Sequence, residues 1–359
     1  MIDLLHAART AVFPPAGKLR FINFYGWHVC NLAGKCKFCI VPFHKVTDPL
    51  SGREIIMARK ERREAFRRLR LLSVPNAIMS ILGGETTLRP ELLLEIVEDA
   101  FGYGFLVNVV TNGYALTPGL IVRLAKAGLH HLAISVDCNG GPRQELEKAL
   151  ELHQVTRKNG GIPVINVLVS SDTNISDLKK FCQKVIDAKC FVSLLAMSPN
   201  IGGMFSSADP ATVPTNNQLC EIVKWLAWKK MTTGLITSSF GYLWTLYRAG
   251  SFENGNMKLW HCADHFRGIE GSGRGFITLD SDGTICPCQE YRSSLNILTI
   301  PEEHLSLHFI DEELSRITRQ CEHCFFNCYI MEEAMHGVKT LIELPTAARF
   351  IQIKRAAHR

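Results

Sequence analysis

Residues 30–39, CNLAGKCKFC, contain three cysteines within a single short stretch. Cys30, Cys36 and Cys39 are spaced Cys-x5-Cys-x2-Cys. The stretch follows a short apolar run at 21–25, which is the pattern of a buried strand. We therefore expect three thiolates to meet in one loop at the end of a strand.

Two kinds of metal site are compatible with these thiolates. Structural zinc takes four ligands, but no fourth Cys or His has zinc-finger spacing here, and His28 and His44 are the nearest imidazoles. An iron-sulfur cube held by three cysteines instead keeps one iron open for a substrate or cofactor. The spacing favours an iron-sulfur site, with three structural or zinc-binding thiols as the alternative.

Three further motifs each follow an apolar run. They are Gly83-Gly84-Glu85, Thr111-Asn112-Gly113 and Ser135-Val136-Asp137. Glycines let the backbone turn and come close to a ligand, and Glu85 offers a carboxylate to an ammonium group. Phe38 precedes the last cysteine of the loop, where an aromatic face could cover a flat ring. Turns at strand ends, with a surface Glu in the first, are the alternative interpretation of these motifs.

Taken as an ordered set, the motifs resemble the radical S-adenosylmethionine (radical SAM) family over residues 18–200. The resemblance implies that a reduced [4Fe-4S] cluster cleaves SAM, and that the resulting 5'-deoxyadenosyl radical abstracts hydrogen from a substrate. The usual family spacing is Cys-x3-Cys-x2-Cys, so the two extra residues leave the subfamily open. The resemblance implies cluster ligation by Cys30, Cys36 and Cys39, and SAM contacts by Phe38, Gly83, Gly84, Glu85, Ser135 and Asp137.

Apolar runs alternate with helical patterns from residue 19 onward, which predicts a parallel sheet with crossover helices. The expected strands are 21–25, 77–82, 106–111, 132–136, 163–169 and 191–196. The expected helices between them are 53–71, 90–101, 117–127, 143–158 and 175–188. Because such crossovers are right-handed, the units should curl into an α/β fold, a partial (β/α)6 TIM-like barrel. Its chemistry is expected at the carboxyl ends of the strands.

A second group of cysteines lies in the carboxyl-terminal third. An apolar run at 276–279, an Asp-Gly turn at 280–283 and Cys286-Pro287-Cys288 predict a β-hairpin. A Cys-rich loop and a run with helical pattern follow. Together with Cys262, this segment resembles the SPASM or Twitch extension found after many radical SAM barrels, over residues 262–335.

The second resemblance implies one auxiliary [4Fe-4S] cluster. Its candidate ligands are Cys262, Cys288, Cys321, Cys324 and Cys328. Strand alternation does not exclude Cys286, which lies two residues before Cys288, and a zinc ribbon is the rival interpretation. The remaining cysteines are scattered and are expected to be small buried apolar residues; they are Cys138, Cys182, Cys190 and Cys220.

These patterns predict five parts of the chain. They are an amino-terminal extension (1–18), the core barrel (19–214), connecting helices (215–258), a small auxiliary-cluster domain (259–340) and a tail (341–359). The loop at 198–214 is rich in Gly, Ser and Pro and marks the end of the barrel. Helices are expected at 217–230 and 240–249.

The composition is that of an ordinary globular protein: 359 residues, 47% hydrophobic and 21% charged. The cysteine count is odd, at thirteen, and most cysteines fall into two spaced groups, which favours a reducing compartment over a disulfide framework. Residues 1–18 lack the pattern of a secretion signal, and no apolar run approaches membrane length. We expect a cytoplasmic protein without a membrane anchor.

The net charge is +6, with a dense basic run at 59–70. Such a run could bind nucleic acid or an acidic peptide. Ile55, Ile56, Phe66 and Leu69 interrupt the charges at helical spacing, so the solvated face of an amphipathic helix is the favoured interpretation.

The expected function is radical modification of a peptide or protein side chain, with a flavodoxin- or ferredoxin-type electron donor. The alternative is the same chemistry on a small molecule such as a sugar, nucleoside or lipid precursor. An iron-sulfur electron carrier or a zinc-dependent nucleic-acid binder would leave Gly83-Gly84-Glu85 and Phe38 unexplained. The sequence assigns no catalytic residue beyond the cluster ligands.

Overall fold

The computed structural model describes residues 18–33, 35–36, 47, 51–138, 144–197, 213–250, 275–288 and 291–318, with residues 343, 346, 348, 349 and 352. One sheet of eight strands forms its centre, in the order β6-β5-β4-β3-β2-β1-β7-β8. The strands are β1 (Leu19–Tyr25), β2 (Ser73–Leu82), β3 (Leu106–Thr111), β4 (Leu129–Ser135), β5 (Ile162–Val169), β6 (Phe191–Ala196), β7 (Phe276–Leu279) and β8 (Ile285–Cys286).

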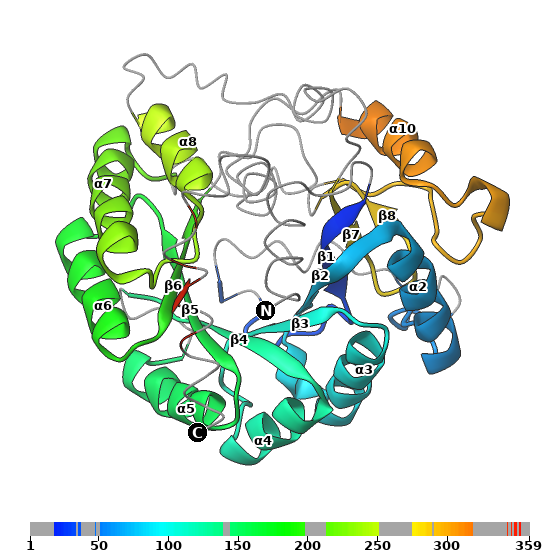
Figure 1. The fold of residues 1–359 in the computed structure, drawn as a ribbon, viewed down its shortest axis with the longest axis horizontal. Coiled ribbons are helices and arrows are strands. Elements are labelled where there is room, and N and C mark those ends of the chain that lie inside the picture. The colour runs from blue at the N-terminus through cyan, green and yellow to red at the C-terminus, as the bar shows by residue number, and fades with distance from the viewer. Residues whose placement is uncertain are drawn as a thin grey trace.

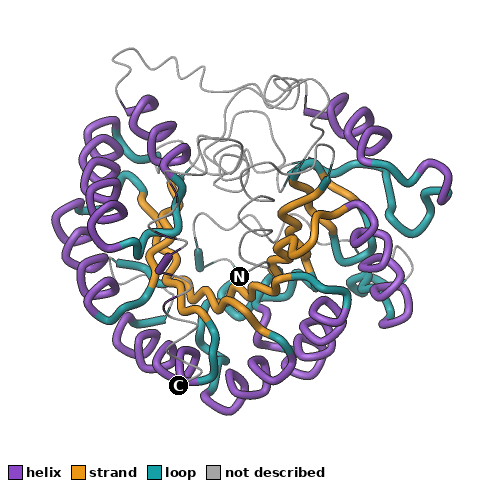
Figure 2. The backbone as a smooth tube through the Cα atoms, in the orientation of Figure 1, coloured by secondary structure: helices purple, strands orange, loops and turns teal. Residues whose placement is uncertain are grey.

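Helices cover the convex side of this sheet (Figure 1). They are α2 (Arg59–Leu72), α3 (Pro90–Gly102), α4 (Pro118–Ala127), α5 (Leu146–Lys158), α6 (Ile175–Asp187), α7 (Asn216–Thr233), α8 (Phe240–Gly250) and α10 (Leu307–Thr318). Two short 3-10 turns, η2 (Thr86–Leu88) and η4 (Glu302–His304), complete the described elements. Figure 2 shows the strands along the inner side of an open curve and most helices along its outer side. The predicted partial barrel is confirmed.

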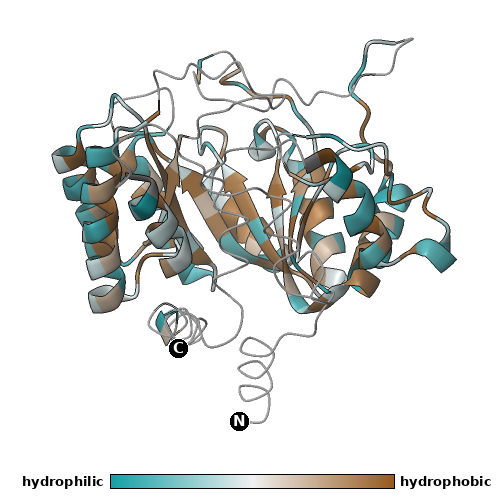
Figure 3. Ribbon diagram, turned by 90° about the horizontal axis from the view of Figure 1, so that it is seen from above, coloured by the Kyte–Doolittle hydropathy of each residue, from teal (hydrophilic) through white to brown (hydrophobic). Residues whose placement is uncertain are grey.

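The hydrophobic core lies between the sheet and the helices. Ile22 and Phe24 of β1 are buried, and the Phe24 ring meets the edge of Phe66 from α2 at 5.2 Å between centroids. Because side chains alternate along a strand, Asn23 and Tyr25 point to the other, concave face. In Figure 3 the strands are mostly hydrophobic, with single hydrophilic positions between.

The hairpin formed by β7 and β8 extends the barrel sheet. β7 pairs with β1 in parallel, with Phe21 opposite Phe276 and Phe24 opposite Leu279. β8 then returns antiparallel to β7 and closes the predicted hairpin. The segment with the second cysteine group is therefore joined to the strand that leads into the first cysteine loop.

Helix α2 begins later than the pattern predicted, at residue 59 instead of 53. Residues 55–57 are held by the hairpin turn instead: the Met57 amide donates to the Ser281 carbonyl at 2.8 Å, and the Ser281 hydroxyl donates to the Ile55 carbonyl at 2.8 Å. These contacts provide partners for backbone groups that a helix would otherwise use.

The basic run at 59–70 lies on α2, and several of its arginines bind acceptors within the protein. Arg62 is buried and contacts Asp99 of α3 at 3.1 Å. Arg68 donates to two backbone carbonyls in residues 297–300. The helix is amphipathic as predicted, but Arg62 does not lie on its solvated face, because its charge joins α2 to α3.

Candidate active site

The sequence motifs meet at one edge of the sheet. β1, β2, β3 and β4 are parallel neighbours, so their carboxyl ends lie side by side. The cysteine loop follows β1, and the three glycine- or serine-containing motifs follow the next three strands. This is the edge at which barrels of this type carry their chemistry.

Gly83 and Gly84 accommodate the backbone that leads into the cysteine loop. A Cβ on Gly83 would lie 2.4 Å from the Trp27 carbonyl oxygen, and one on Gly84 would lie 2.1 Å from the Val29 carbonyl oxygen. The Gly84 amide donates to the Trp27 carbonyl at 2.8 Å, and the Glu85 amide donates to the Val29 carbonyl at 2.8 Å. These glycines were expected to let the backbone come close to a ligand. Among the described residues, the group that comes close to them is the protein's own backbone at Trp27 and Val29.

The Glu85 side chain is buried and surrounded by donors. Its Oε1 accepts from the Thr87 amide at 2.9 Å and from the Thr87 and Thr111 hydroxyls at 2.5 Å each. Its Oε2 accepts from the Asn112 amide at 2.6 Å. The Glu85 carbonyl also accepts from the Trp27 indole at 2.9 Å. The surface-Glu interpretation is therefore wrong, and the SAM contact predicted for this carboxylate stays a prediction.

Asn112 joins this network to the first cysteine. Its Nδ2 donates to Asn31 Oδ1 at 2.8 Å and lies 4.0 Å from Cys30 Sγ. The Leu32 amide approaches the same sulfur at 3.3 Å. Donors near a thiolate stabilise its charge and tune a metal cluster bound to it. Asn112 was expected only to cap a turn, but its side chain also supports the cysteine loop.

Cys30 and Cys36 are both half-buried. Several other predicted site residues lie outside the described residues: Phe38, Cys39, Cys262, Cys321, Cys324 and Cys328, together with His44. Among the residues that the structure describes, no group of three or more His, Cys, Asp or Glu side chains is arranged to hold a metal ion. The cluster assignments therefore stay predictions.

His28 is not placed as a zinc ligand. Its Nδ1 lies 3.0 Å from Glu54 Oε1 and its Nε2 lies 3.2 Å from Asp280 Oδ1, so a carboxylate faces each ring nitrogen. Burial by itself would lower the pKa of His28, but the hydrogen bonds and charges of Asp280 and Glu54 raise it to about 9. A protonated imidazole has no lone pair for a metal.

Ser135 begins a polar row on the concave face of the sheet. It lies opposite Asn166 of β5, which lies opposite Ser193 of β6. All three side chains are half-buried, as is that of Asp137. Asn166 and Ser193 were not predicted as site residues, although each is a polar residue within an apolar run, which can mark a position that faces a barrel interior.

The hairpin places Cys286 on the same concave face. Cys286 pairs with Thr278, which lies opposite Asn23 of β1. Cys286 and Cys288 are both buried, and burial raises the pKa of Cys286 to about 12. Of the scattered cysteines, Cys182 and Cys190 are fully buried, as expected, whereas Cys138 and Cys220 are half-buried.

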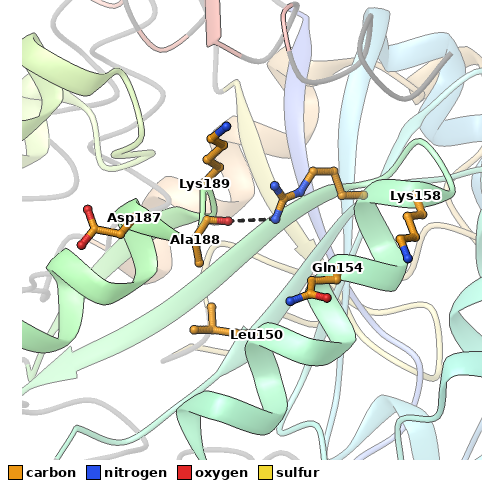
Figure 4. Close-up of a pocket in the computed structure, with 7 residues that line it drawn as sticks. Leu150, Gln154, Lys158, Asp187, Ala188 and Lys189 are labelled. Carbon is orange, nitrogen blue, oxygen red and sulfur yellow. Dashed lines mark hydrogen bonds between the residues drawn. The ribbon is translucent and has the colours of Figure 1, made fainter. Parts of the chain in front are cut away.

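A cavity of about 610 Å³ lies elsewhere, at the amino ends of β5 and β6. Its lining comes from residues 150–158 of α5 and from residues 187–189 at and after the end of α6, and Arg157 donates there to the Ala188 carbonyl at 2.8 Å (Figure 4). Because the motifs lie at the carboxyl ends of the strands, this cavity is not part of the candidate site.

Within the described ranges, no helix has both the length and the apolar character needed to cross a bilayer.

Residues 25–185 match the family model of the radical SAM superfamily. Streptococcus suis SuiB bound to S-adenosylmethionine has a similar fold, with a TM-score of 0.60 and 15% identity over 89% of this chain and 72% of SuiB. SuiB bound to the precursor peptide SuiA matches 95% of this chain and 77% of its own, with the same TM-score of 0.60 and 15% identity.

Native anSMEcpe with bound AdoMet is also similar, with a TM-score of 0.56 and 15% identity over 94% of this chain and 99% of its own. It has also been solved with a peptide named Cp18Cys. At these identities the likeness establishes a shared fold. The family uses a [4Fe-4S] cluster and S-adenosylmethionine as cofactors. Residues 25–185 therefore form a radical SAM domain, and the solved structures that the chain resembles are radical SAM enzymes.

Proposed function

We propose that this radical SAM enzyme modifies a side chain of a peptide or protein substrate. The observation that carries the proposal is the extent of the likeness to SuiB with its bound peptide, which reaches 95% of this chain. The likeness therefore extends well beyond the radical SAM domain at 25–185. The peptide-bound form of anSMEcpe adds a second example, covering 94% of this chain.

The donor set at the first loop fits an iron-sulfur cluster. Cys30, Cys36 and Cys39 would hold it, and the first two are half-buried. The Leu32 amide and the Asn112 side chain would donate toward the Cys30 sulfur. When bound, the cluster and SAM supply reductive cleavage to a 5'-deoxyadenosyl radical, for which a flavodoxin- or ferredoxin-type protein would provide the electron.

Residues of the concave face would position SAM and the substrate. Ser135, Asn166 and Ser193 offer hydroxyl and amide groups that suit ribose hydroxyls, a carboxylate or a peptide amide. Asp137 follows this row, and Phe38 would cover the adenine ring. Gly83, Gly84 and Glu85 keep the backbone before Cys30 close to the end of β2. We propose that they act on SAM in two ways, by contacting it and by supporting the cysteine loop.

An auxiliary cluster would lie beyond the hairpin. Cys288, with Cys262, Cys321, Cys324 and Cys328, would supply its ligands. An anaerobic iron and sulfide assay should give about eight irons per chain for two cubane clusters. About four irons with one zinc would favour the zinc ribbon.

The substrate class can be tested with the reconstituted enzyme, SAM and a reductant. A host extract should stimulate formation of 5'-deoxyadenosine, and digestion of that extract with a protease, removed before the assay, should abolish the stimulation. Matched digestion with a nuclease should have no effect. Stimulation that survives the protease and passes a small-molecule filter would overturn the peptide proposal and favour a small-molecule substrate.

A further inference from the structure

Two neighbouring helices beyond β6 carry exposed tryptophan and methionine side chains. α7 and α8 pack against each other at one end of the curved sheet (Figure 1). Trp228 and Met231 of α7 are 50% and 62% exposed, and Trp244 of α8 is 60% exposed. The last two values are the highest among the large hydrophobic side chains that the structure describes. Exposed apolar side chains that gather on one surface mark an interaction site, whereas scattered ones do not.

Lysines and aromatic rings join these side chains into one patch. Lys229 Nζ lies 4.4 Å from the centroid of the Trp228 ring. One turn before Trp228 on the same face of α7, Lys224 Nζ lies 5.3 Å from the centroid of the Tyr247 ring of α8. The Tyr247 ring in turn lies 5.6 Å from the Trp244 ring. The aromatic-lysine patch thus consists of Lys224, Trp228, Lys229, Met231, Trp244 and Tyr247.

The inner side of α7 is fixed by a third lysine. Lys230 is fully buried, and its Nζ donates to the Ile236 carbonyl and to the Thr346 hydroxyl at 2.8 Å each. The same Nζ lies 2.8 Å from Glu343 Oε2. A buried ammonium that loses its partners is strongly destabilising. These contacts therefore oppose any rotation of α7 that would bury the exposed rings, and the patch is a preformed surface.

The two lysines of the patch have different partners from the lysines of the neighbouring helix α6. All three lysines of α6 lie 2.6–3.7 Å from a carboxylate oxygen. Within the described ranges, Lys224 and Lys229 form no ion pair and lie over aromatic rings instead. The face of a ring attracts a cation but does not neutralise its charge. The patch is therefore apolar and positively charged at once, which suits an anionic partner.

An anionic lipid surface fits this combination better than an acidic protein does. Tryptophan and tyrosine have an apolar ring and a polar tip, and they favour the boundary between bilayer and water. Lysine lays its methylene chain along apolar surface and keeps its ammonium among the headgroups. In protein interfaces tryptophan and methionine are enriched, but lysine is depleted. Lysines placed among exposed tryptophans therefore favour lipid.

We propose that the aromatic-lysine patch binds reversibly to the surface of a bilayer that contains anionic lipids. The rings of Trp228 and Trp244 would lie at the level of the headgroups, with Lys224 and Lys229 against lipid phosphates. Such contact is peripheral and needs no helix that spans the bilayer. It does not depend on the proposed substrate, because α7 and α8 carry none of the motif residues of the candidate active site.

Vesicle binding by the full-length, anaerobically reconstituted protein tests this proposal. The vesicles contain phosphatidylcholine alone or phosphatidylcholine with an equal amount of phosphatidylglycerol, and sedimentation measures the bound fraction. The parent should bind the anionic vesicles, and added salt should weaken this binding. Its tryptophan fluorescence should move to shorter wavelength in their presence. The double variant Trp228→Ala with Trp244→Ala should lower the partition coefficient at least about tenfold, because it removes exposed apolar area.

The charge of the patch is tested separately, with controls outside it. Lys224→Gln and Lys229→Gln should each weaken binding to the anionic vesicles about fivefold. Leu71→Ala on α2, at a side chain that is 54% exposed, and Lys180→Gln on α6 should leave binding unchanged. A circular dichroism melt shows that each variant is folded. Parent-level binding by the folded tryptophan variant, or equal binding of the parent to both kinds of vesicle, would overturn the proposal.

Sedimentation velocity without vesicles tests whether a second copy of the chain covers the patch instead. We expect the parent and the double tryptophan variant to sediment with the same mass. A parent dimer that the variant loses, together with no binding to anionic vesicles, would show that the patch joins two copies and that the lipid proposal is wrong. Absence of vesicle binding without such a dimer would contradict the proposal equally.

Discussion

Glu85 and Asp280 are two buried carboxylates beside the same cysteine loop, and they are stabilised in different ways. Glu85 accepts from backbone amides and hydroxyls, all of them neutral donors. Asp280 faces two cations, His28 and Arg292. Neutral donors fix the orientation of a carboxylate without changing the net charge of its site, whereas a cation also balances the negative charge of the carboxylate.

The comparison shows how one loop can be anchored from both sides. On the β2–β3 side, the anchor is geometric and requires glycine at two positions. On the β7 side, the anchor is ionic and joins residues that are distant in sequence. We therefore expect substitutions that add bulk to destabilise the protein most on the β2–β3 side, and substitutions that remove charge to destabilise it most on the β7 side.

Gly84→Ala should have the largest effect on stability. The new Cβ would lie 2.1 Å from the Val29 carbonyl oxygen, so the backbone before Cys30 would have to move. We expect a loss of at least about 3 kcal/mol in the free energy of unfolding, and a lower iron content after reconstitution. Chemical denaturation and an iron assay measure both.

Gly102→Ala is the control for this change, because its added Cβ would meet no atom within 4 Å apart from its chain neighbours and the backbone of its own helix. It should leave both quantities close to the parent values. If Gly84→Ala behaves like this control, steric anchoring on the β2 side is not needed.

Asp280→Asn should have the next largest effect on stability. The change leaves the buried His28 with one carboxylate fewer, and we expect a loss of about 2–3 kcal/mol in the free energy of unfolding. The exposed pair of Arg67 and Glu302, at 2.6 Å, provides the matched control. Glu302→Gln should cost less than about 0.5 kcal/mol. Equal losses in the two variants would show that burial does not strengthen the ionic anchor.

Glu85→Gln should have a smaller effect, about 1–2 kcal/mol in the free energy of unfolding. An amide has one oxygen, so in either orientation its NH₂ group faces a backbone donor at Thr87 or Asn112. Glu91→Gln, at an exposed carboxylate, is the control. A midpoint of denaturation unchanged from the parent would mean that the network around Glu85 adds little to stability.

Much of the fold was predictable because its signals are local. Alternating apolar runs and helical patterns predicted β1 to β6, and the Asp-Gly turn predicted the hairpin. The pairing of β7 with β1 was not predictable, because no local pattern links residue 21 with residue 276. The start of α2 at residue 59 was also not predictable, because residues 55–57 bind Ser281, which is distant in the sequence.

The candidate site divides in the same way. The motifs were predicted at the strand ends because parallel strands place their carboxyl ends together. The partners within the site were not predictable: nothing near Glu85 in the sequence indicates Asn112, and nothing near His28 indicates Asp280. Single polar residues in apolar runs, such as Asn166, are the one local signal that could have extended the predicted site.

Formation of 5'-deoxyadenosine shows whether the loop with Cys30, Cys36 and Cys39 holds the radical SAM site. The parent protein and the Cys36→Ala variant would be reconstituted anaerobically and incubated with SAM and a strong reductant, and the nucleoside would be quantified by mass spectrometry. We expect steady formation by the parent and none by a folded Cys36→Ala variant, because the loop would then lack one of its three thiolates. Equal formation by the two proteins would contradict the assignment of the radical site to this loop.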